Sequence, residues 1–364
     1  MMMRSGPSWA GISSDSTSTP SARGDRVGPR GMPQRSAEDT GRAERVHGGA
    51  YVIDAACPLV NPKDIDQQLP ELRRGGVTCA VGTVASIEGS RETLHAIAAW
   101  FPTLRERCGD LCLATTAADI EAAKRAGKVA VVLQFQGGTP LDYNANLVEA
   151  FYRLGVRVIQ LTYNERNPLG DGCTERTDAG LSDLGVRVIA EMNRLGVAVD
   201  LSHVGYRTSM EAIEASAAPV IFSHSNARAV CDSARNLTDD QMRAAAARGG
   251  VIGVNAFPAF VARHQAPTVE HLLDHIEYMV RVVGDDHVGL GFDFSRETEE
   301  DYKYFKYKED VYPKPPWVYP AGIDGFAKIP NVTRGLVARG YSDDAIRKIL
   351  GGNFLRIFRQ VWGG

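Results

Sequence analysis

The feature that most constrains the fold is the stretch 197–225, in which two short apolar runs are each followed by Ser-His. The first run, VAVDL, precedes His203, and the second, PVIF, precedes His224. Both runs are bounded by Gly, Pro or Ser and are typical of strands buried on both faces. The segment between them, YRTSMEAIEAS, is predicted to be a helix. The stretch is therefore predicted to form a βαβ unit.

This unit predicts where the two histidines lie. Parallel strands joined by a helix point the same way, so His203 and His224 leave their strands at one edge, where α/β folds bind ligands. Two neutral imidazoles that meet there can hold a divalent metal ion. The alternative for each histidine, a hydrogen-bonding residue of a loop, stays open.

The same alternation of apolar runs and helical segments continues along the chain. Strong strand-like runs begin near residues 51, 77, 129, 157, 197, 219, 251 and 288, and a shorter strand-like piece, LCLATT, lies between the second and the third. Eight strands alternating with helices predict a (β/α)₈ barrel of the TIM type. A doubly wound open sheet is the alternative, but no glycine-rich phosphate loop follows the first strand.

Composition predicts the domain boundary and the compartment. Residues 1–48 are rich in Ser, Gly, Pro and Arg and are predicted to be a disordered tail, whereas residues 49–364 are predicted to form one barrel domain. No apolar segment resembles a signal peptide or reaches the roughly 18 residues that a membrane span needs. Six cysteines without a CxxC spacing indicate neither a zinc knuckle nor a redox pair. We expect a cytoplasmic protein that does not associate with membranes.

The net charge of the chain limits the kinds of partner that it is expected to bind. A net charge of −3 gives no electrostatic case for binding nucleic acid, so a small-molecule substrate is expected. The stretch 302–317 combines many aromatic residues with Lys/Glu pairs. It predicts either a lid over the mouth of the barrel or an interface, including one in a homo-oligomer.

Active sites of such barrels lie at the carboxyl ends of the strands. The residues found at these positions are the candidates for the site: Asp54, Cys57, Gln136, Tyr163, His203, His224, Asn255 and Asp293.

From about residue 51 to its end the chain resembles the membrane (renal) dipeptidase family of metal-dependent barrel hydrolases. The resemblance is carried by the blocks LGVRVIQLTYN, GLSDLGVRVIAEMNRLGVAVDLSH, APVIFSHS followed by SARNLTDDQ, DHVGLGFDF and ILGGNFLRIF. In that family two zinc ions share a bridging glutamate. The resemblance implies that His203 and His224 are the two-histidine ligand of one zinc, that Arg235 binds substrate, and that Asp293 is the aspartate after the eighth strand.

This sequence departs from the family at the other zinc. Where the family has Asp-Gly-His-x-Asp, the chain has Asp-Ala-Ala-Cys-Pro at 54–58, so Ala56 and Pro58 replace both ligands. Gln136 occupies the position of the bridging carboxylate, and Tyr163 occupies that of a histidine. Alanine and proline have no side-chain donor, and a neutral glutamine does not offset the charge of two cations. We expect the binuclear centre not to form.

One zinc ion per chain is then the expected cofactor. It would be held by His203 and His224 and completed by Asp293, because three protein ligands and a water make a catalytic zinc site. Other donors also remain open as the third ligand: the oxygen of Gln136, the thiolate of Cys57, which is more often a buried apolar residue, and the loop acids Asp171, Glu175 and Asp178.

Each candidate then has an expected role. Asp293 is predicted to be the general base, and Arg235 is predicted to bind a substrate carboxylate through its planar fork. Tyr163 is a candidate for catalysis and for hydrogen bonding to a substrate oxygen, and Asn255 is a further substrate-binding candidate. Asp54 is expected to be structural or to lie behind the ligands.

Three functions compete on this evidence. The first is a metal-dependent hydrolase of a small amide or dipeptide-like substrate with a mononuclear site. The second is a lyase or isomerase in which His203, His224 and Tyr163 act as acid and base. The third is a catalytically silent barrel that binds a small ligand. Fold alone does not choose among them.

Overall fold

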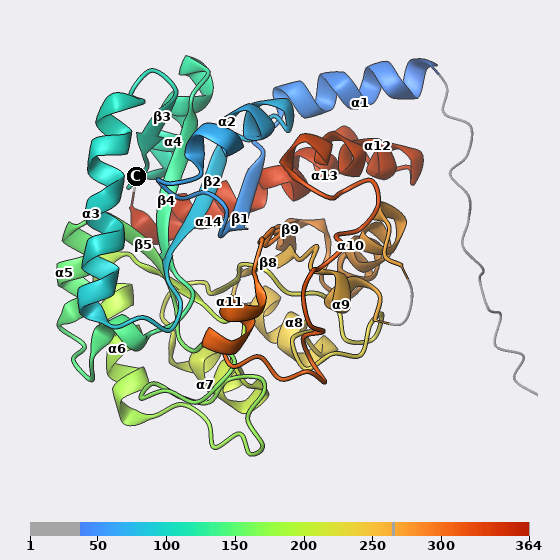
Figure 1. The fold of residues 1–364 in the computed structure, drawn as a ribbon. Coiled ribbons are helices and arrows are strands. Elements are labelled where there is room, and N and C mark those ends of the chain that lie inside the picture. Colours follow the sequence, from blue (N-terminus) through green and yellow to red (C-terminus); the bar gives the residue numbers. More distant parts are fainter. Residues whose placement is uncertain (1–36, 264–265, 364) are drawn as a thin grey trace, which may run out of the picture. The chain divides into compact units, whose positions relative to one another are not determined.

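Eight parallel strands form a closed barrel in the computed structural model, which describes residues 37–263 and 266–363 (Figure 1). The ring closes because β2 pairs with β4 on one side and with β1 on the other, and β1 also pairs with β9. The predicted (β/α)₈ fold is confirmed. The strands of the ring are β1 (Ile53–Cys57), β2 (Cys79–Ala85), β4 (Val129–Phe135), β5 (Val156–Gln160), β6 (Ala198–Asp200), β7 (Ile221–Phe222), β8 (Val251–Val254) and β9 (Val288–Leu290).

A ninth strand lies outside this ring. It is β3 (Leu111–Leu113), the short LCL segment, which pairs in parallel with the first residues of β4. The later residues of β4 pair with β5 along the same edge. β3 therefore extends one edge of β4 without entering the barrel.

The strands are buried on both faces, as their apolar runs predict. All seven residues of β4 are buried. Alternate residues of the ring, such as Ile53, Val81 and Val132, pack in one cluster with apolar residues of the last helix, α14 (Asn353–Trp362). Because α14 contacts β1, β6, β8 and β9, it closes one end of the barrel. The carboxyl ends of the strands are left for the site.

Helices follow the strands and cover the outside of the barrel, where their apolar faces pack on the other face of the strands. Thr238 caps α8 (Asp239–Ala247), because its side chain accepts from the Gln241 N–H in a capping box. The helices between the strands are α2 (Ile65–Arg74), α3 (Ser90–Glu106), α4 (Ala117–Ala126), α5 (Leu147–Arg153), α6 (Asp183–Leu195), α7 (Tyr206–Ala215), α8 (Asp239–Ala247), α9 (Pro258–Val261) and α10 (Val269–Val283).

The ordered domain begins earlier than its composition predicts. Residues 37–48, assigned to a disordered tail, belong to helix α1 (Ala37–Gly49), which packs against α12 (Pro330–Ala338) and α13 (Asp343–Arg347). Few apolar residues mark this helix, because only Ala43 and Val46 are buried and Arg42 pairs with Asp343 at 2.8 Å. The polar composition of α1 therefore gave no sign of a helix in the sequence. The rest of the predicted tail lies outside the described residues.

Part of the aromatic stretch after β9 is helical. Its first part forms α11 (Glu299–Tyr304), which begins with a capping box at Thr298. The following residues contact the loop after β5, since the Tyr307 hydroxyl lies 2.6 Å from the Tyr163 hydroxyl. In Figure 1 this orange segment lies near the ends of β8 and β9.

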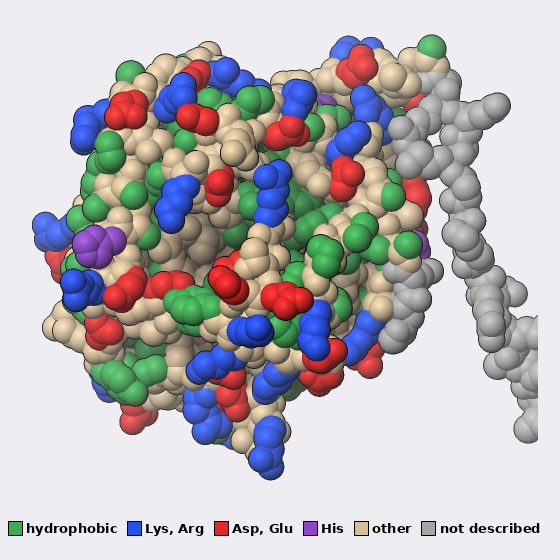
Figure 2. Space-filling view, viewed as in Figure 1, with side chains coloured by type: hydrophobic (Ala, Val, Ile, Leu, Met, Phe, Trp, Pro, Cys, Tyr) green, Lys and Arg blue, Asp and Glu red, His purple; other side chains and the backbone are tan. Residues whose placement is uncertain are grey.

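Three further observations concern the state of the cysteines, membrane-spanning helices and the charge of the surface. All six cysteines are free thiols. Within the described residues, no helix is long and apolar enough to span a membrane. On the face seen in Figure 2, basic and acidic side chains are interspersed without a large basic patch. The location in the cytoplasm stays a prediction.

Substitution of Val46 by alanine tests whether α1 is part of the domain. Val46 is 1% exposed, so we expect its loss of two methyl groups to lower the free energy of unfolding by about 1–2 kcal/mol. Denaturant unfolding measures this change. The exposed Glu44 of the same helix provides the control, Glu44→Ala, for which little change is expected. An equal result for both variants would mean that α1 does not contribute to the core.

Candidate active site at the barrel mouth

The βαβ unit brings its two histidines together, as predicted. His203 follows β6 and His224 follows β7, and their Nε2 atoms lie 2.8 Å apart. Both rings are buried. Burial, followed by the charge of Arg235, lowers the pKa of each imidazole well below its ordinary value, so both are neutral at pH 7.

His203 is held by two residues of the loop after β5. Its Nδ1 lies 2.8 Å from Oδ1 of Asn164, and its ring stacks on Tyr163 with centroids 4.3 Å apart. The same Asn164 oxygen accepts a hydrogen bond of 3.0 Å from the Tyr312 hydroxyl. Because an amide oxygen only accepts, His203 carries its proton on Nδ1.

His224 is held by a chain of hydrogen bonds that ends at a carboxylate. Its Nδ1 lies 2.6 Å from the Ser223 hydroxyl, which donates to Oδ2 of Asp200 at 2.5 Å. Asp200 also accepts from the backbone N–H groups of Ser202 and Ser223. Since the single Ser223 proton goes to Asp200, His224 must donate from its own Nδ1.

The two assignments leave both Nε2 lone pairs directed at each other. A direct N–H···N bond would need one proton on Nε2, and the Nδ1 partners do not leave one there. With both protons on Nδ1, a cation between the two nitrogens would stabilise this arrangement. Metal-ligating histidines commonly donate their other ring N–H to such partners, so the pair fits a metal ion.

Asp293 lies beside the pair. Its Oδ2 is 4.0 Å from Nε2 of His224 and accepts a hydrogen bond of 3.4 Å from Asn255. Burial raises the pKa of its carboxyl group to about 7. Its φ of 57° and the φ of 62° at His203 are in the left-handed region, which costs free energy in residues other than glycine and is common at functional sites.

The predicted third ligand is not in place. Among the described residues, no three His, Cys, Asp or Glu side chains lie close enough together to hold a metal ion. Asp293 is the nearest carboxylate to the pair, but it bonds to Asn255 instead.

Most of the other proposed donors are engaged elsewhere. The Cys57 thiol is buried and donates to the Asp54 carbonyl, and burial raises its pKa. The Gln136 NH2 group donates to Thr83, whereas its side chain lines the same pocket as His203 and Asp293, so its oxygen stays a candidate. The loop acids are used in other contacts or lie on the far side of His203: Asp171 pairs with Arg166, Asp178 accepts from backbone N–H groups at the start of α7, and Glu175 accepts from the Arg166 N–H.

Arg235 is buried in the loop between β7 and α8, with 2% of its surface exposed. One Nη donates to the carbonyl of His224 at 3.2 Å, and its guanidinium lies over the ring of Phe260. Its Nε has no hydrogen-bond partner. A buried guanidinium with an unused donor can bind an anionic group.

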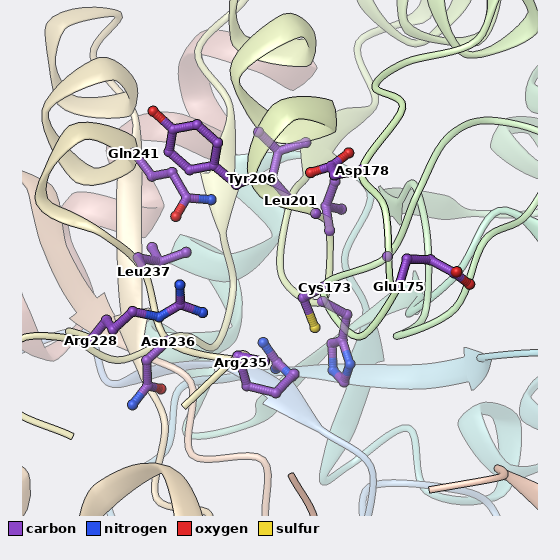
Figure 3. Close-up of a pocket in the computed structure, with 15 residues that line it drawn as sticks. Cys173, Glu175, Asp178, Leu201, Tyr206, Arg228, Arg235, Asn236, Leu237 and Gln241 are labelled. Atoms are coloured by element: carbon purple, nitrogen blue, oxygen red, sulfur yellow. The ribbon is translucent and has the colours of Figure 1, made fainter. Parts of the chain in front are cut away.

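Two pockets of about 150–160 Å³ meet at His203, which lines both. The first, here called the arginine pocket, has Arg228 and Arg235 on one side and Glu175 and Asp178 on the other (Figure 3). The second, here called the aromatic pocket, is lined by Pro58, Thr83, Ser86, Gln136, Tyr163, His203, Phe257, Asp293, Ser295, Glu297, Phe305, Tyr307, Tyr312 and Trp317.

The structure shows the surroundings of two further predicted residues. Asn255 lines neither pocket and is fully buried, and its amide donates to Asp293, so it positions that carboxylate, and its role in substrate binding stays a prediction. The Tyr163 hydroxyl is bonded to Tyr307, so its ring, and not its hydroxyl, meets His203. Strand position alone did not reveal these orientations.

Several site residues escaped the sequence analysis. Asn164 and Tyr312 hold His203, and Asp200 and Ser223 hold His224. The Asp in VAVDL and the Ser of each Ser-His pair were visible signals for the second group. Tyr312 lies 148 positions from Asn164, and no local pattern links them.

The comparisons with known proteins agree with this geometry. The family model described as membrane dipeptidase (peptidase family M19) matches residues 49–306 and 317–362. An uncharacterized dipeptidase of Schizosaccharomyces pombe is 34% identical over 249 residues, which are 66% of this chain and 55% of that relative. The chain thus spans about half the length of this curated relative.

Solved structures give the same fold. An amidohydrolase from Pseudomonas aeruginosa is 33% identical with a TM-score of 0.82, and the match covers 88% of this chain and 99% of the other. A metallopeptidase from Rhodobacter sphaeroides, liganded with a phosphinate mimic of the dipeptide L-Ala-D-Ala, has a TM-score of 0.74 over 86% of this chain and 99% of the other. At 22% identity, that second likeness shows the fold alone.

Replacement of Asp54 by asparagine tests the electrostatics beneath the site. The Oδ1 of Asp54 accepts from the Phe292 and Ala56 N–H groups, whereas its buried Oδ2 has no partner. Burial raises the pKa of this carboxyl group from 3.8 to about 7. Between these values the unfolded chain loses the proton and the folded chain keeps it, so wild-type stability falls as pH rises.

Asparagine stays neutral and keeps an accepting oxygen. We therefore expect the stability of Asp54→Asn relative to wild type to increase from about pH 4 to about pH 7, as measured by denaturant unfolding at several pH values. The exposed Asp142 supplies the control, Asp142→Asn. A difference that does not change with pH would contradict the account of Asp54.

Proposed function

Because this chain belongs to the membrane dipeptidase family, we propose that it is a dipeptidase-like hydrolase that cleaves a small amide at the barrel mouth with one metal ion per chain. The observation that carries the proposal is the pair of neutral imidazoles whose Nε2 lone pairs converge at 2.8 Å. Such a pair is a ready ligand for a divalent cation.

The residues that would hold the metal are His203 and His224, with Asp293 as the nearest carboxylate to complete the set. Zinc is the proposed ion, because nitrogen and carboxylate donors suit it, and bound zinc lowers the pKa of a coordinated water to about 7. A second ion is not part of the proposal, because Ala56 and Pro58 offer no side-chain donor and Gln136 has no charge.

Asp293 is proposed to accept the proton of the attacking water. Its carboxyl group lies beside the histidine pair, with Oδ2 4.0 Å from Nε2 of His224, where a water held by the pair would lie within its reach. The Asn255 amide holds Oδ2 of this carboxylate, and the Asp293 N–H donates to the Ala56 carbonyl of β1. The base is therefore fixed to two neighbouring strands.

Arg235 is proposed to bind a carboxylate of the substrate from the arginine pocket. Its unpartnered Nε and its burial favour an anionic ligand, since a buried guanidinium forms strong hydrogen bonds to carboxylates. Arg228 lines the same pocket and adds positive charge. The amide to be cleaved would then lie beside His203, which lines both pockets.

Tyr163 is proposed to orient His203 by stacking, because its hydroxyl is already bonded to Tyr307. The lyase or isomerase alternative required Tyr163 as an acid or base, and burial raises the pKa of its hydroxyl well above its ordinary value. The structure therefore supports hydrolysis over that alternative. A homo-oligomer and a cytoplasmic location stay predictions.

Substitution of His224 by alanine tests the proposed centre. We expect at least a hundredfold loss of kcat on a panel of dipeptides and N-acyl amino acids, because one of the two convergent nitrogens is removed. In the wild type, a chelator should abolish turnover and added Zn²⁺ should restore it.

The exposed His95 on α3 provides the matched control, His95→Ala, which should keep wild-type activity. Turnover that survives complete chelation but is lost in His224→Ala would overturn the metal and point to acid–base chemistry of the pair. Binding of these compounds without turnover, in zinc-loaded wild type, would favour the catalytically silent alternative.

A further inference from the structure

The aromatic pocket is built from an unusual set of side chains for a site that binds an amide. Six of its residues have aromatic rings: Tyr163, Phe257, Phe305, Tyr307, Tyr312 and Trp317. The rings also pack against one another. Tyr307 stacks on Tyr312 with centroids 4.2 Å apart, and Phe257 meets Trp317 edge to face at 4.6 Å. A ligand in this pocket is enclosed largely by π systems.

Part of this wall belongs to a segment that the family model does not match. The model matches residues up to 306 and again from 317, so Tyr307 and Tyr312 lie in the unmatched ten residues, 307–316. Both nevertheless reach the site, because Tyr307 bonds to Tyr163 and Tyr312 bonds to Asn164. This part of the pocket wall therefore lies outside the residues that the family model matches.

The groups that can bring charge into the pocket are acids. Asp293 and Glu297 line it, and none of the described residues that line it is a lysine or arginine. Burial raises the pKa of Glu297 to about 8, so its carboxyl group is largely protonated at pH 7 and ionises when a cation is bound beside it. Arg235 lines the arginine pocket, and its charge acts on Asp293 and Tyr312 of the aromatic pocket.

Glu297 also has an unused acceptor. The Tyr163 hydroxyl bonds to that of Tyr307, and Tyr307 donates to Oε1 of Glu297 at 3.2 Å. These two hydrogen bonds use the hydroxyl protons of both tyrosines and Oε1 of Glu297. Oε2 is buried and has no hydrogen-bond partner. A buried, unpartnered carboxyl oxygen beside aromatic rings is a place for a ligand cation.

We propose that the aromatic pocket binds the ammonium group of the substrate and prefers an N-methylated ammonium. Aromatic rings attract cations through their quadrupoles, and cages of several rings with an acid are the known binding mode for quaternary ammonium groups. A primary ammonium has three N–H donors to satisfy. One free acceptor, Oε2 of Glu297, can take one of these donors, and where the remaining positions face rings, methyl groups pack without the cost of an unsatisfied N–H.

This inference rests on the proposed function for its substrate, since the ammonium end would lie across His203 from the carboxylate end at Arg235. It specifies the amine end of the substrate, which would be an amide or dipeptide-like compound with a methylated amine. Its test measures binding without turnover, so loss of the hydrolase proposal would leave it standing, and its own failure would leave hydrolysis of other amides possible.

The experiment is a calorimetric titration of the full-length protein with tetramethylammonium chloride at constant ionic strength. We expect saturable binding to the wild type and no detectable binding of tert-butanol, which is of similar shape but neutral. Two single variants remove different parts of the pocket. Glu297→Gln removes the acid that ionises beside the bound cation and Trp317→Leu removes a ring, and each should weaken binding about tenfold.

Matched controls lie outside the pocket. Glu300→Gln changes an exposed acid of α11, and Tyr206→Leu removes a ring that lines the arginine pocket, so both should bind as the wild type does. Thermal unfolding of each variant checks that it is folded. Equal affinity for tert-butanol and tetramethylammonium, no binding of either, or wild-type affinity in both Glu297→Gln and Trp317→Leu would overturn the proposal.

Discussion

The site depends on the approach of two imidazole nitrogens to 2.8 Å at the carboxyl end of a parallel barrel. Parallel pairing places His203 and His224 at the ends of adjacent strands β6 and β7, and hydrogen bonds to Asn164 and Ser223 fix the proton of each ring on Nδ1. Two lone pairs then face each other in a buried place. This arrangement favours a cation between the two nitrogens, and the proposed chemistry of the site follows from that preference.

The surroundings of this pair differ on its two sides. On one side of His203, the buried guanidinium of Arg235 has a free Nε, and on the other side the acids Asp293 and Glu297 lie in a pocket with six aromatic residues. A substrate with an anionic end and a cationic end would be oriented by this division before any reaction. The left-handed φ values at His203 and Asp293 indicate that the surrounding structure holds both residues against local preference.

Much of the fold was predictable, because strands buried on both faces and amphipathic helices leave strong local patterns. The eight strands of the ring, α7 between the two histidines and the cap at Thr238 follow from such patterns. Helix α1 did not, because two buried residues and an ion pair to a helix about 300 residues away hold it, and none of these is a local signal.

For the site, the sequence predicted which residues stand at strand ends but not where their side chains turn. Asn255 supports Asp293, and the Tyr163 hydroxyl binds Tyr307, because partners from distant loops decide side-chain direction. The segment 307–316 shows the same limit, since its aromatic residues gave no sign of which surface they would cover. Tyr312 reaches Asn164, and through it His203, because this segment folds over the mouth of the barrel.

The most direct test of the convergent pair is zinc K-edge X-ray absorption on protein loaded with one equivalent of Zn²⁺. The account predicts a single class of zinc with two imidazole nitrogens at about 2.0 Å and the remaining positions filled by oxygen. Zinc that is ligated by thiolate sulfur, or that shows fewer than two imidazoles, would contradict it.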